Sequence, residues 1–198
     1  HKQIDGSELL FSYVCLNLLA RRACGLCHNS WMCRKIGVNL HKFYERTADM
    51  PQQNFENDNI KTRIVDGRQE IFDCLRGKYV AMTPEENVRQ MFVRHLIDGK
   101  RYPAGLMGNE IAINQNGRER RCDTVVFDRR GCPLMIVEYK APSVKITQEV
   151  FNQVYRYNTV LRVKYLTVCN GRQLFCCRVD YDANKAVFLK DVPCYDDL

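Results

Sequence analysis

Two apolar stretches that end in charged residues decide the fold: RCDTVVF at 121–127 and LMIVEYK at 134–140. Their β-branched and aromatic side chains are typical of strands. The second stretch is almost continuously apolar, which indicates a central strand buried on both faces. Residues 129–133 between them include glycine and proline and predict a turn. We therefore expect a hairpin in which Asp123 lies level with Glu138 and Lys140.

The charged residues at the end of this hairpin form a candidate site. Glu138 and Lys140 are two residues apart, so they point to the same face of their strand. Charges there are costly unless they are paired or bind a metal. Carboxylates at this spacing suit Mg²⁺, with Mn²⁺ as a substitute, and a neighbouring lysine can stabilise charge on a phosphate. The plainer alternative is two strand-end ion pairs, Asp123 with Arg121 and Glu138 with Lys140.

Helices and further strands are predicted around the hairpin. The run TPEE at 83–86 indicates a helix start, with Thr83 as the N-cap and Glu86 as the capping-box residue. That helix is expected to end at 98–99, and a second helix spans 147–161. Further strands are predicted over 60–65, 69–74, 78–82, 110–114, 164–169, 174–180 and 186–189. This order predicts an α/β fold, a three-layer sandwich in which helices flank a mixed sheet.

The composition sets the class of protein. The 198 residues are 45% hydrophobic and 27% charged, as in an ordinary soluble globular protein. No apolar run approaches the length of a membrane span, so no membrane association is expected. The 11 cysteines are an odd number, and several lie in apolar strands, which favours reduced thiols in a cytoplasmic protein. The net charge of +7 permits a polyanionic partner without requiring one.

Residues 1–49 differ in composition and predict a separate cysteine-rich segment ahead of a domain at 50–198. Cys24, Cys27 and Cys33 suit a Zn²⁺ site, with Cys15, His28 or His41 as a further ligand. The C-x-x-C-H run at 24–28 also matches a haem attachment motif, but that requires export, and no signal sequence is recognisable. Chance clustering of cysteines outside the core is the plainer alternative.

Three runs together carry a family resemblance: TPEENVRQMFVRHLI (83–97), NGRERRCDTVVFD (116–128) and GCPLMIVEYKAPSVKITQEVFNQVYRYN (131–158). They resemble the PD-(D/E)XK nuclease superfamily, and more narrowly the N-terminal domain of type I restriction enzyme R subunits in a short, stand-alone form. The resemblance covers about residues 50–198. It implies a restriction-endonuclease-like fold and Mg²⁺-dependent hydrolysis of phosphodiester bonds in DNA.

The resemblance implies roles for the strand residues. Asp123 and Glu138 are the expected metal ligands, together with the backbone carbonyl of Tyr139. Lys140 is the expected catalytic lysine. Cys122 stands where the literal motif has proline, a departure that many members share.

Two helices are expected to complete the site. Gln153 and Tyr157 match a Q-x-x-x-Y motif of helicase-linked members, and their i, i+4 spacing puts them on one helix face. The plainer alternative is a surface amide beside a core tyrosine. A glutamate from the first helix often joins this site. Glu85 is the better candidate because it lies near the apolar stripe, whereas capping accounts for Glu86.

Basic residues near the Asp123 strand and on or near the second helix predict phosphate contacts, with a plain solvated rim as the alternative: Arg120, Arg121, Arg130, Lys145 and Arg156. No Walker lysine motif occurs, so DNA translocation is expected to need a separate motor. The expected partners are DNA, motor or methyltransferase subunits of a restriction system, and a second copy in a homodimer.

Three functions remain open at this point. The first is a metal-dependent DNA nuclease. The second is a non-catalytic nucleic-acid-binding or assembly module of a restriction-modification system. The third is a zinc-dependent binding protein that works through its cysteine cluster. The intact set of Asp123, Glu138 and Lys140 favours the nuclease, because a decayed copy often loses one of them.

Overall fold

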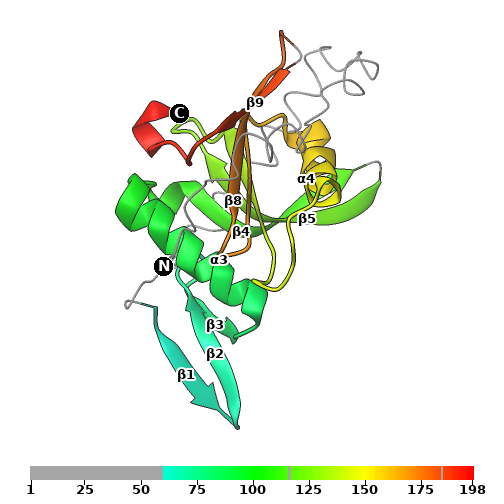
Figure 1. Ribbon diagram of the computed structural model, residues 1–198. Helices are drawn as coiled ribbons and strands as arrows, with labels where there is room; N and C mark the ends of the chain where they lie inside the picture. Colours follow the sequence, from blue (N-terminus) through cyan, green and yellow to red (C-terminus); the bar gives the residue numbers. More distant parts are fainter. Residues whose placement is uncertain (1–59, 116, 184) are drawn as a thin grey trace.

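The computed structural model describes residues 60–115, 117–183 and 185–198 (Figure 1). The expected zinc residues Cys24, Cys27 and Cys33 and the expected domain boundary at residue 50 lie outside the described residues, so these stay predictions. The described chain is a mixed α/β structure with a six-stranded and a three-stranded sheet.

The six-stranded sheet forms the centre, with strand order β4-β5-β6-β7-β8-β9. Neighbouring strands are antiparallel except β6 and β7, which are parallel. The strands are β4 Met107–Gln115, β5 Arg118–Phe127, β6 Pro133–Tyr139, β7 Tyr165–Cys169, β8 Leu174–Asp180 and β9 Lys185–Leu189. β7 is buried along its whole length and β6 over its last five residues, as their continuous apolar sequences predict.

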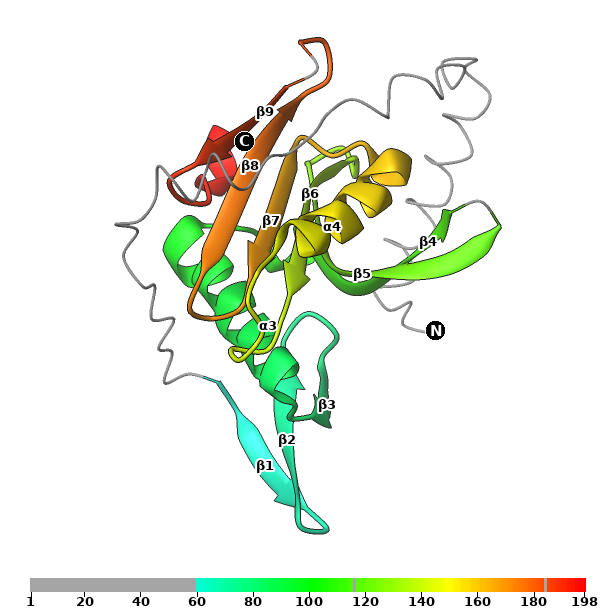
Figure 2. The ribbon, with the colours of Figure 1, turned by 45° about the vertical axis from the view of Figure 1, so that its right-hand side comes forward.

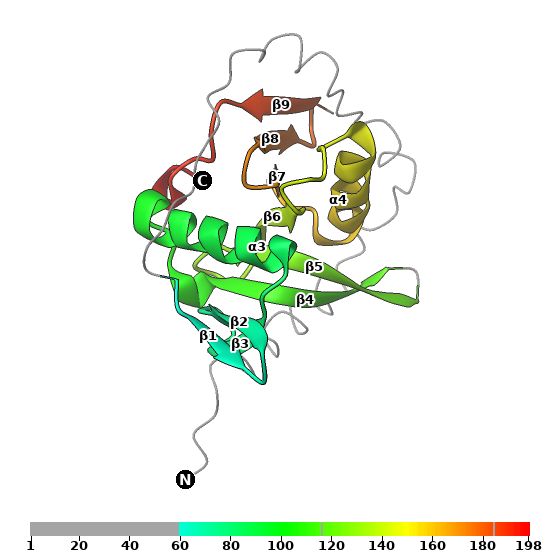
Figure 3. The same ribbon diagram turned by 60° about the horizontal axis from the view of Figure 1, so that its bottom comes forward.

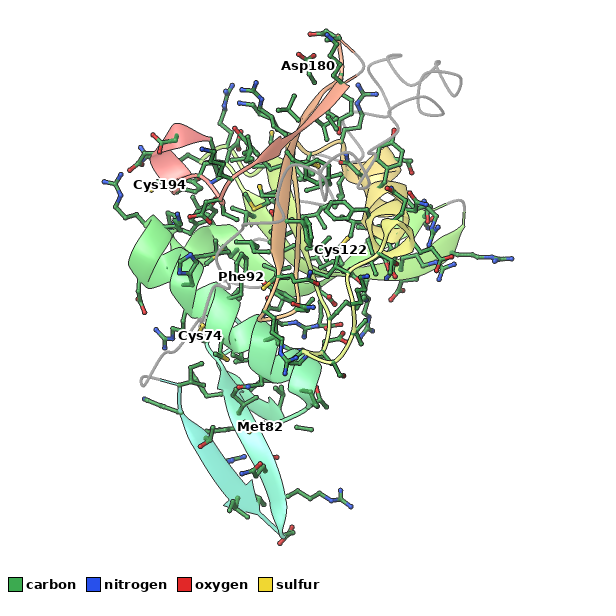
Figure 4. All side chains as sticks on the ribbon, viewed as in Figure 1. Cys74, Met82, Phe92, Cys122, Asp180 and Cys194 are labelled. Carbon is green, nitrogen blue, oxygen red and sulfur yellow. The ribbon has the colours of Figure 1, made fainter. Side chains whose placement is uncertain are left out.

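One helix lies on each face of this sheet (Figures 1 and 2). Successive residues of a strand point to opposite faces, so Ile136 and Val137 mark the two sides of β6. Ile136 belongs to a core cluster with α4, Gln148–Leu161. Val137 belongs to a second cluster with α3, Pro84–Arg94, whose Phe92 points toward the sheet in Figure 4.

The predicted start of α3 is confirmed at its N-cap. The Thr83 hydroxyl accepts a hydrogen bond from the Glu86 N–H at 3.0 Å. The Thr83 N–H, however, donates to the Ala81 carbonyl, and the Glu86 carboxylate binds Arg89. The capping-box role predicted for the Glu86 side chain was therefore wrong, because a buried arginine one turn along binds it instead. The helix continues as a π-helical turn, His95–Gly99, to the predicted end.

A three-stranded antiparallel sheet precedes α3 and projects from the body of the protein (Figures 1 and 3). Its strands are β1 Thr62–Val65, β2 Arg68–Asp73 and β3 Lys78–Ala81. The predicted hairpin turn is confirmed at Asp66 and Gly67, whose φ values of 49° and 73° are the left-handed pair that suits the twist of a hairpin.

Asp73 anchors the small sheet to the large one. Its Oδ1 accepts hydrogen bonds from the N–H groups of Leu75 and Arg76, both at 2.9 Å. Its Oδ2 accepts from the Arg76 guanidinium and, at 2.9 Å, from the side-chain amide of Asn109 on β4. Burial works to raise the pKa of Asp73, but the hydrogen bonds and the Arg76 charge outweigh it and hold the pKa below the usual value.

At one point along β4, the alternation of its side chains between the two faces of the sheet is interrupted. Met107 and Ile111 are four residues apart, a spacing that puts side chains on one face of a regular strand. Met107 nevertheless packs in the α3-side cluster, and Ile111 packs against the α4-side cluster. The switch lies at Glu110, which has a left-handed φ of 57° and lies between two regular ladder pairs, opposite Asp123.

Two expectations from composition concern the cysteines and the membrane. The cysteines of the described residues are free thiols, and burial raises the pKa of Cys122, Cys169 and Cys176 to about 12. Cys122, labelled in Figure 4, is fully buried in the α4-side cluster. In the part of the chain that the structure describes, no helix has the length and apolar character needed to cross a membrane.

We expect Asp73→Ala to lower the free energy of unfolding by about 3 kcal/mol, because it leaves buried donors and the Arg76 charge without an acceptor. Urea unfolding at pH 7 measures this loss. Asp182→Ala, at an exposed position, is the control and should change stability by less than about 0.5 kcal/mol. Equal effects of the two substitutions would contradict the anchoring role.

Candidate active site

The site begins where β5 and β6 separate. Their last regular ladder pair is Thr124 with Val137, so the next pair in register would be Asp123 with Glu138. Instead, the Oδ2 atom of Asp123 accepts a hydrogen bond from the Tyr139 N–H at 2.8 Å. A side-chain carboxylate thus takes the place of a backbone acceptor. The hairpin brings Asp123 beside the Glu138 and Lys140 strand end, as its sequence predicts.

Glu138 is the most enclosed carboxylate at this strand end, with 3% of its surface exposed. Its Oε1 accepts hydrogen bonds from the Lys140 ammonium at 2.7 Å and from the Gln153 side-chain amide at 2.8 Å. Two donors on one oxygen leave Oε2 as the atom that a cation would meet. The predicted ion pair of Glu138 with Lys140 is present.

Helix α4 supplies the third wall of the site. Gln153 reaches Glu138, and its amide nitrogen also lies 3.2 Å from the hydroxyl of Tyr157. The two α4 residues therefore share one helix face that is directed at the β6 strand end, as the i, i+4 spacing predicts.

Helix α3 brings Glu85 to the site at its first turn. Glu85 is half-buried. Burial raises its pKa, the Asp123 charge raises it further, and the Lys140 charge opposes both. These interactions indicate that Glu85 lies near Asp123 and Lys140, and its role in the site stays a prediction.

Arg89 lies one turn beyond Glu85 and pairs with three carboxylates. Its Nη1 lies 2.7 Å from Glu86 and 2.8 Å from Glu110, and its Nη2 lies 3.0 Å from Asp123. The guanidinium also lies 5.6 Å from the centre of the Tyr139 ring. The predicted ion pair of Asp123 with Arg121 is wrong. Arg89 takes that place because α3 packs over the strand end.

Burial and neighbouring charges shift the pKa values of the ionisable groups at this strand end. Burial, together with the nearby Asp123 charge, raises the pKa of Glu138 to about 7. Burial also raises the pKa of Asp123, but Arg89 and the Tyr139 N–H oppose the effect. The ion pair with Glu138 raises the pKa of Lys140, so the lysine stays protonated at neutral pH. The pKa of Glu138 therefore lies close to neutral pH.

The donor set fits a hard divalent cation held by few protein ligands. No group of three or more His, Cys, Asp or Glu side chains within residues 60–115, 117–183 and 185–198 is arranged to hold a metal ion. Mg²⁺ commonly binds through one or two carboxylates and keeps several water molecules. Asp123 and Glu138, with the Tyr139 carbonyl as a further oxygen, match that mode.

Comparison with known families decides the assignment. A family model described as the type I restriction enzyme R protein N terminus (HSDR_N) matches residues 84–193, more than half of the chain. The chain belongs to this family. In type I restriction enzymes this domain is the nuclease region of the R subunit, and its setting is a restriction system that acts on DNA.

A solved fragment described as an HsdR subunit of a type I restriction enzyme from Vibrio vulnificus YJ016 is similar at 17% identity, with a TM-score of 0.45. The match covers 58% of this chain and 24% of that one, so the chain aligns with about a quarter of that relative. The search of curated proteins gave no match.

The basic residues that were expected to contact DNA fall into two groups in this family member. Arg120 and Arg121 are exposed on β5, three and two residues before Asp123. Lys145 is exposed on the loop after Lys140, and Arg156 on α4.

Arg130 stands apart from that group. It lies in the turn between β5 and β6, at the end of the hairpin remote from Asp123. Five extended residues, about 17 Å, separate Asp123 from the start of that turn. The structure does not bring Arg130 together with the other basic residues.

Two residues of the site were not predicted from the sequence, Arg89 and Glu110. Arg89 had a weak signal, since it lies beside Val88 and one turn after Glu85, on the side of α3 that faces the sheet. Glu110 had none, because its left-handed backbone and its contact with Arg89 depend on packing between β4 and α3.

We expect the metal-free protein to lose stability as pH rises through 7. Between about pH 4.5 and 7, folded Glu138 keeps a proton that the unfolded chain has released, so the folded state binds more protons there. Unfolding free energies in EDTA at pH 5.5 and 8 measure the slope. Glu138→Gln should flatten it, and the exposed control Glu119→Gln should not. Equal slopes in all three proteins would contradict the assignment.

Proposed function

We propose that this protein is a metal-dependent nuclease that hydrolyses phosphodiester bonds in DNA. The observation that carries the proposal is the strand end where β5 and β6 separate: Asp123 accepts the Tyr139 N–H there, and Glu138 pairs with Lys140. Membership in the R-protein family supports a nuclease. The arrangement of one helix on each face of a mixed sheet supports the finer proposal of a restriction-endonuclease-like three-layer sandwich with a PD-(D/E)XK site.

The cation, Mg²⁺ or Mn²⁺, would be held by Asp123, Glu138 Oε2 and the Tyr139 carbonyl. When bound, it supplies positive charge for the phosphate and lowers the pKa of a coordinated water. The protein residues do the rest. Gln153 and Lys140 hold Oε1 of Glu138, so its other oxygen is fixed in one direction.

Lys140 acts as a charge and not as a base in this proposal. Its ammonium has a raised pKa and lies 2.7 Å from Glu138, so it has no free pair to accept a proton at neutral pH. It can instead donate a hydrogen bond to a phosphate oxygen and stabilise the charge that develops there. Glu85, half-buried and with a raised pKa, is the carboxyl group placed to exchange a proton with a water.

The β4–β5 ribbon is the proposed DNA-binding arm. It continues beyond the bend at Asp123 toward α4, where the Gln115 amide donates to the Arg156 carbonyl at 2.8 Å. Arg120 and Arg121 lie on this ribbon close to the site. A two-stranded ribbon fits the major groove, and its arginines would bind phosphates. Lys145 and Arg156 would extend the same surface.

The restriction context suggests partners. The family description, the N terminus of the type I restriction enzyme R protein, supports a partnership with other parts of a restriction system. We propose that motor and methyltransferase subunits deliver DNA to this domain, which then makes the cut. A second copy would be needed to cut both strands at once.

The first test is cleavage of supercoiled and linear DNA in Mg²⁺ or Mn²⁺. Lys140→Met and Glu138→Gln should each reduce the rate by at least about 100-fold, because they remove transition-state charge stabilisation and a metal ligand. Arg129→Ala, in the turn remote from the site, is the matched control and should retain the wild-type rate. Thermal unfolding curves establish that each variant folds.

Equal background cleavage in all four proteins would contradict a nuclease that acts alone. DNA binding would then decide between a non-catalytic module and a protein that does not bind DNA.

The DNA-binding arm gives a prediction about salt. Arg120→Ala/Arg121→Ala should weaken DNA binding and reduce the slope of log K against log salt by about 1.8, because each phosphate contact contributes about 0.9. Fluorescence anisotropy with a labelled duplex between 50 and 200 mM salt measures it. Arg129→Ala/Arg130→Ala removes the same charge at the remote turn and should leave the slope almost unchanged. Equal changes in both variants would indicate that net charge, and not the arm, sets the affinity.

A further inference from the structure

Arg89 is surrounded by carboxylates from three elements. Glu86 comes from α3, Glu110 from β4 and Asp123 from β5, and each has an oxygen within 3.0 Å of the guanidinium. The Arg89 side chain is only 6% exposed. A cation in this position therefore has little contact with solvent and is held by the protein itself.

Ion pairs with carboxylates, and not complete hydrogen bonding, hold the Arg89 guanidinium in this position. The Arg89 Nε atom is buried and has no hydrogen-bond partner. Leaving a buried donor unpaired is unfavourable, so the carboxylate contacts have to outweigh it. Glu86 has a second, longer contact with Arg76 at 3.6 Å, whereas Arg89 is the cation that joins Glu110 to Asp123.

Asp123 is the carboxylate that Arg89 shares with the proposed metal site. Its Oδ1 contacts Arg89 and its Oδ2 accepts the Tyr139 N–H, and each oxygen keeps a second lone pair. In two-metal sites the ions lie about 3.5–4 Å apart and act together on the attacking and leaving oxygens. Here the Arg89 guanidinium lies on the Oδ1 side of Asp123.

We propose that Arg89 acts as the built-in second cation of this site, so that the protein binds one divalent ion and not two. The inference rests on the proposed function, because the first ion is the one assigned to Asp123 and Glu138. Arg89 is a positioning residue: it fixes the Asp123 carboxylate and neutralises the Glu110 side of the site. Glu110 is a latent ligand that binds metal only when Arg89 is removed.

Removal of the charge should convert the arginine position into a metal site. In the wild type, Glu86, Glu110 and Asp123 lie around the guanidinium and are not arranged to share one ion. Arg89→Met removes that charge, so the three side chains can turn toward one ion, and hard oxygen ligands of this kind suit Mg²⁺ and Mn²⁺. Arg89→Lys keeps a cation and should keep the stoichiometry. The double variant Arg89→Met/Glu110→Gln removes one of the three carboxylates and should lose the new site.

The experiment counts bound Mn²⁺ on the full chain by electron paramagnetic resonance of the free ion. We expect one ion for the wild type and for Arg89→Lys, two for Arg89→Met, and one for Arg89→Met/Glu110→Gln. Thermal unfolding gives a second measurement. Millimolar Mn²⁺ should raise the Tm of Arg89→Met more than that of the wild type, because the added ion replaces the lost charge.

Two ions in the wild type, or no more ions in Arg89→Met than in the wild type, would overturn the proposal. If Arg89→Met folds only with metal, its refolding yield is measured with and without Mn²⁺. A yield that Mn²⁺ does not increase would overturn the proposal. A wild type that binds no ion, with one ion in Arg89→Met, would remove the proposed nuclease site and leave the role of Arg89 standing.

Discussion

The hydrogen bond from the Tyr139 N–H to the Asp123 carboxylate is the contact on which the site depends. It replaces the next ladder bond between β5 and β6, so the two central strands separate while a side chain still connects them. The separation gives the carboxylates of Asp123 and Glu138 room at a place that the sheet would otherwise close. Both strands are buried up to this point, which makes the separation a fixed feature of the core.

Packing on both faces of the sheet fixes the remaining charges around that separation. α4 reaches Glu138 through Gln153, and α3 reaches Asp123 through Arg89. The core clusters reach these positions, through Cys122 on the α4 side and Tyr139 on the α3 side. The apolar packing of α3 and α4 on the sheet therefore fixes the positions of Arg89 and Gln153 relative to the strand ends. An arrangement of this kind is typical of functional sites built on rigid elements.

Much of this arrangement could be predicted from the sequence because it is local. The alternation and turn around 121–140, the N-cap at Thr83 and the spacing of Gln153 and Tyr157 all lie within short windows, and the structure has the predicted elements there. The partners of Asp123 and Glu86 could not be predicted, since both bind Arg89, which comes close only after α3 packs on the sheet. The roles of the site residues and the segment 1–49 stay predictions.

The left-handed backbone of Glu110 has a consequence for how this protein tolerates change. Glycine, asparagine and aspartate adopt that conformation at low energy, whereas most other side chains cost about 1 kcal/mol or more there. The chain nevertheless carries a glutamate, whose longer side chain reaches Arg89. Selection for folding alone would favour a small residue at this position, and selection for the charge arrangement would keep the acid. Residue 110 is therefore a place where backbone stability and the charge arrangement around Arg89 are in direct competition.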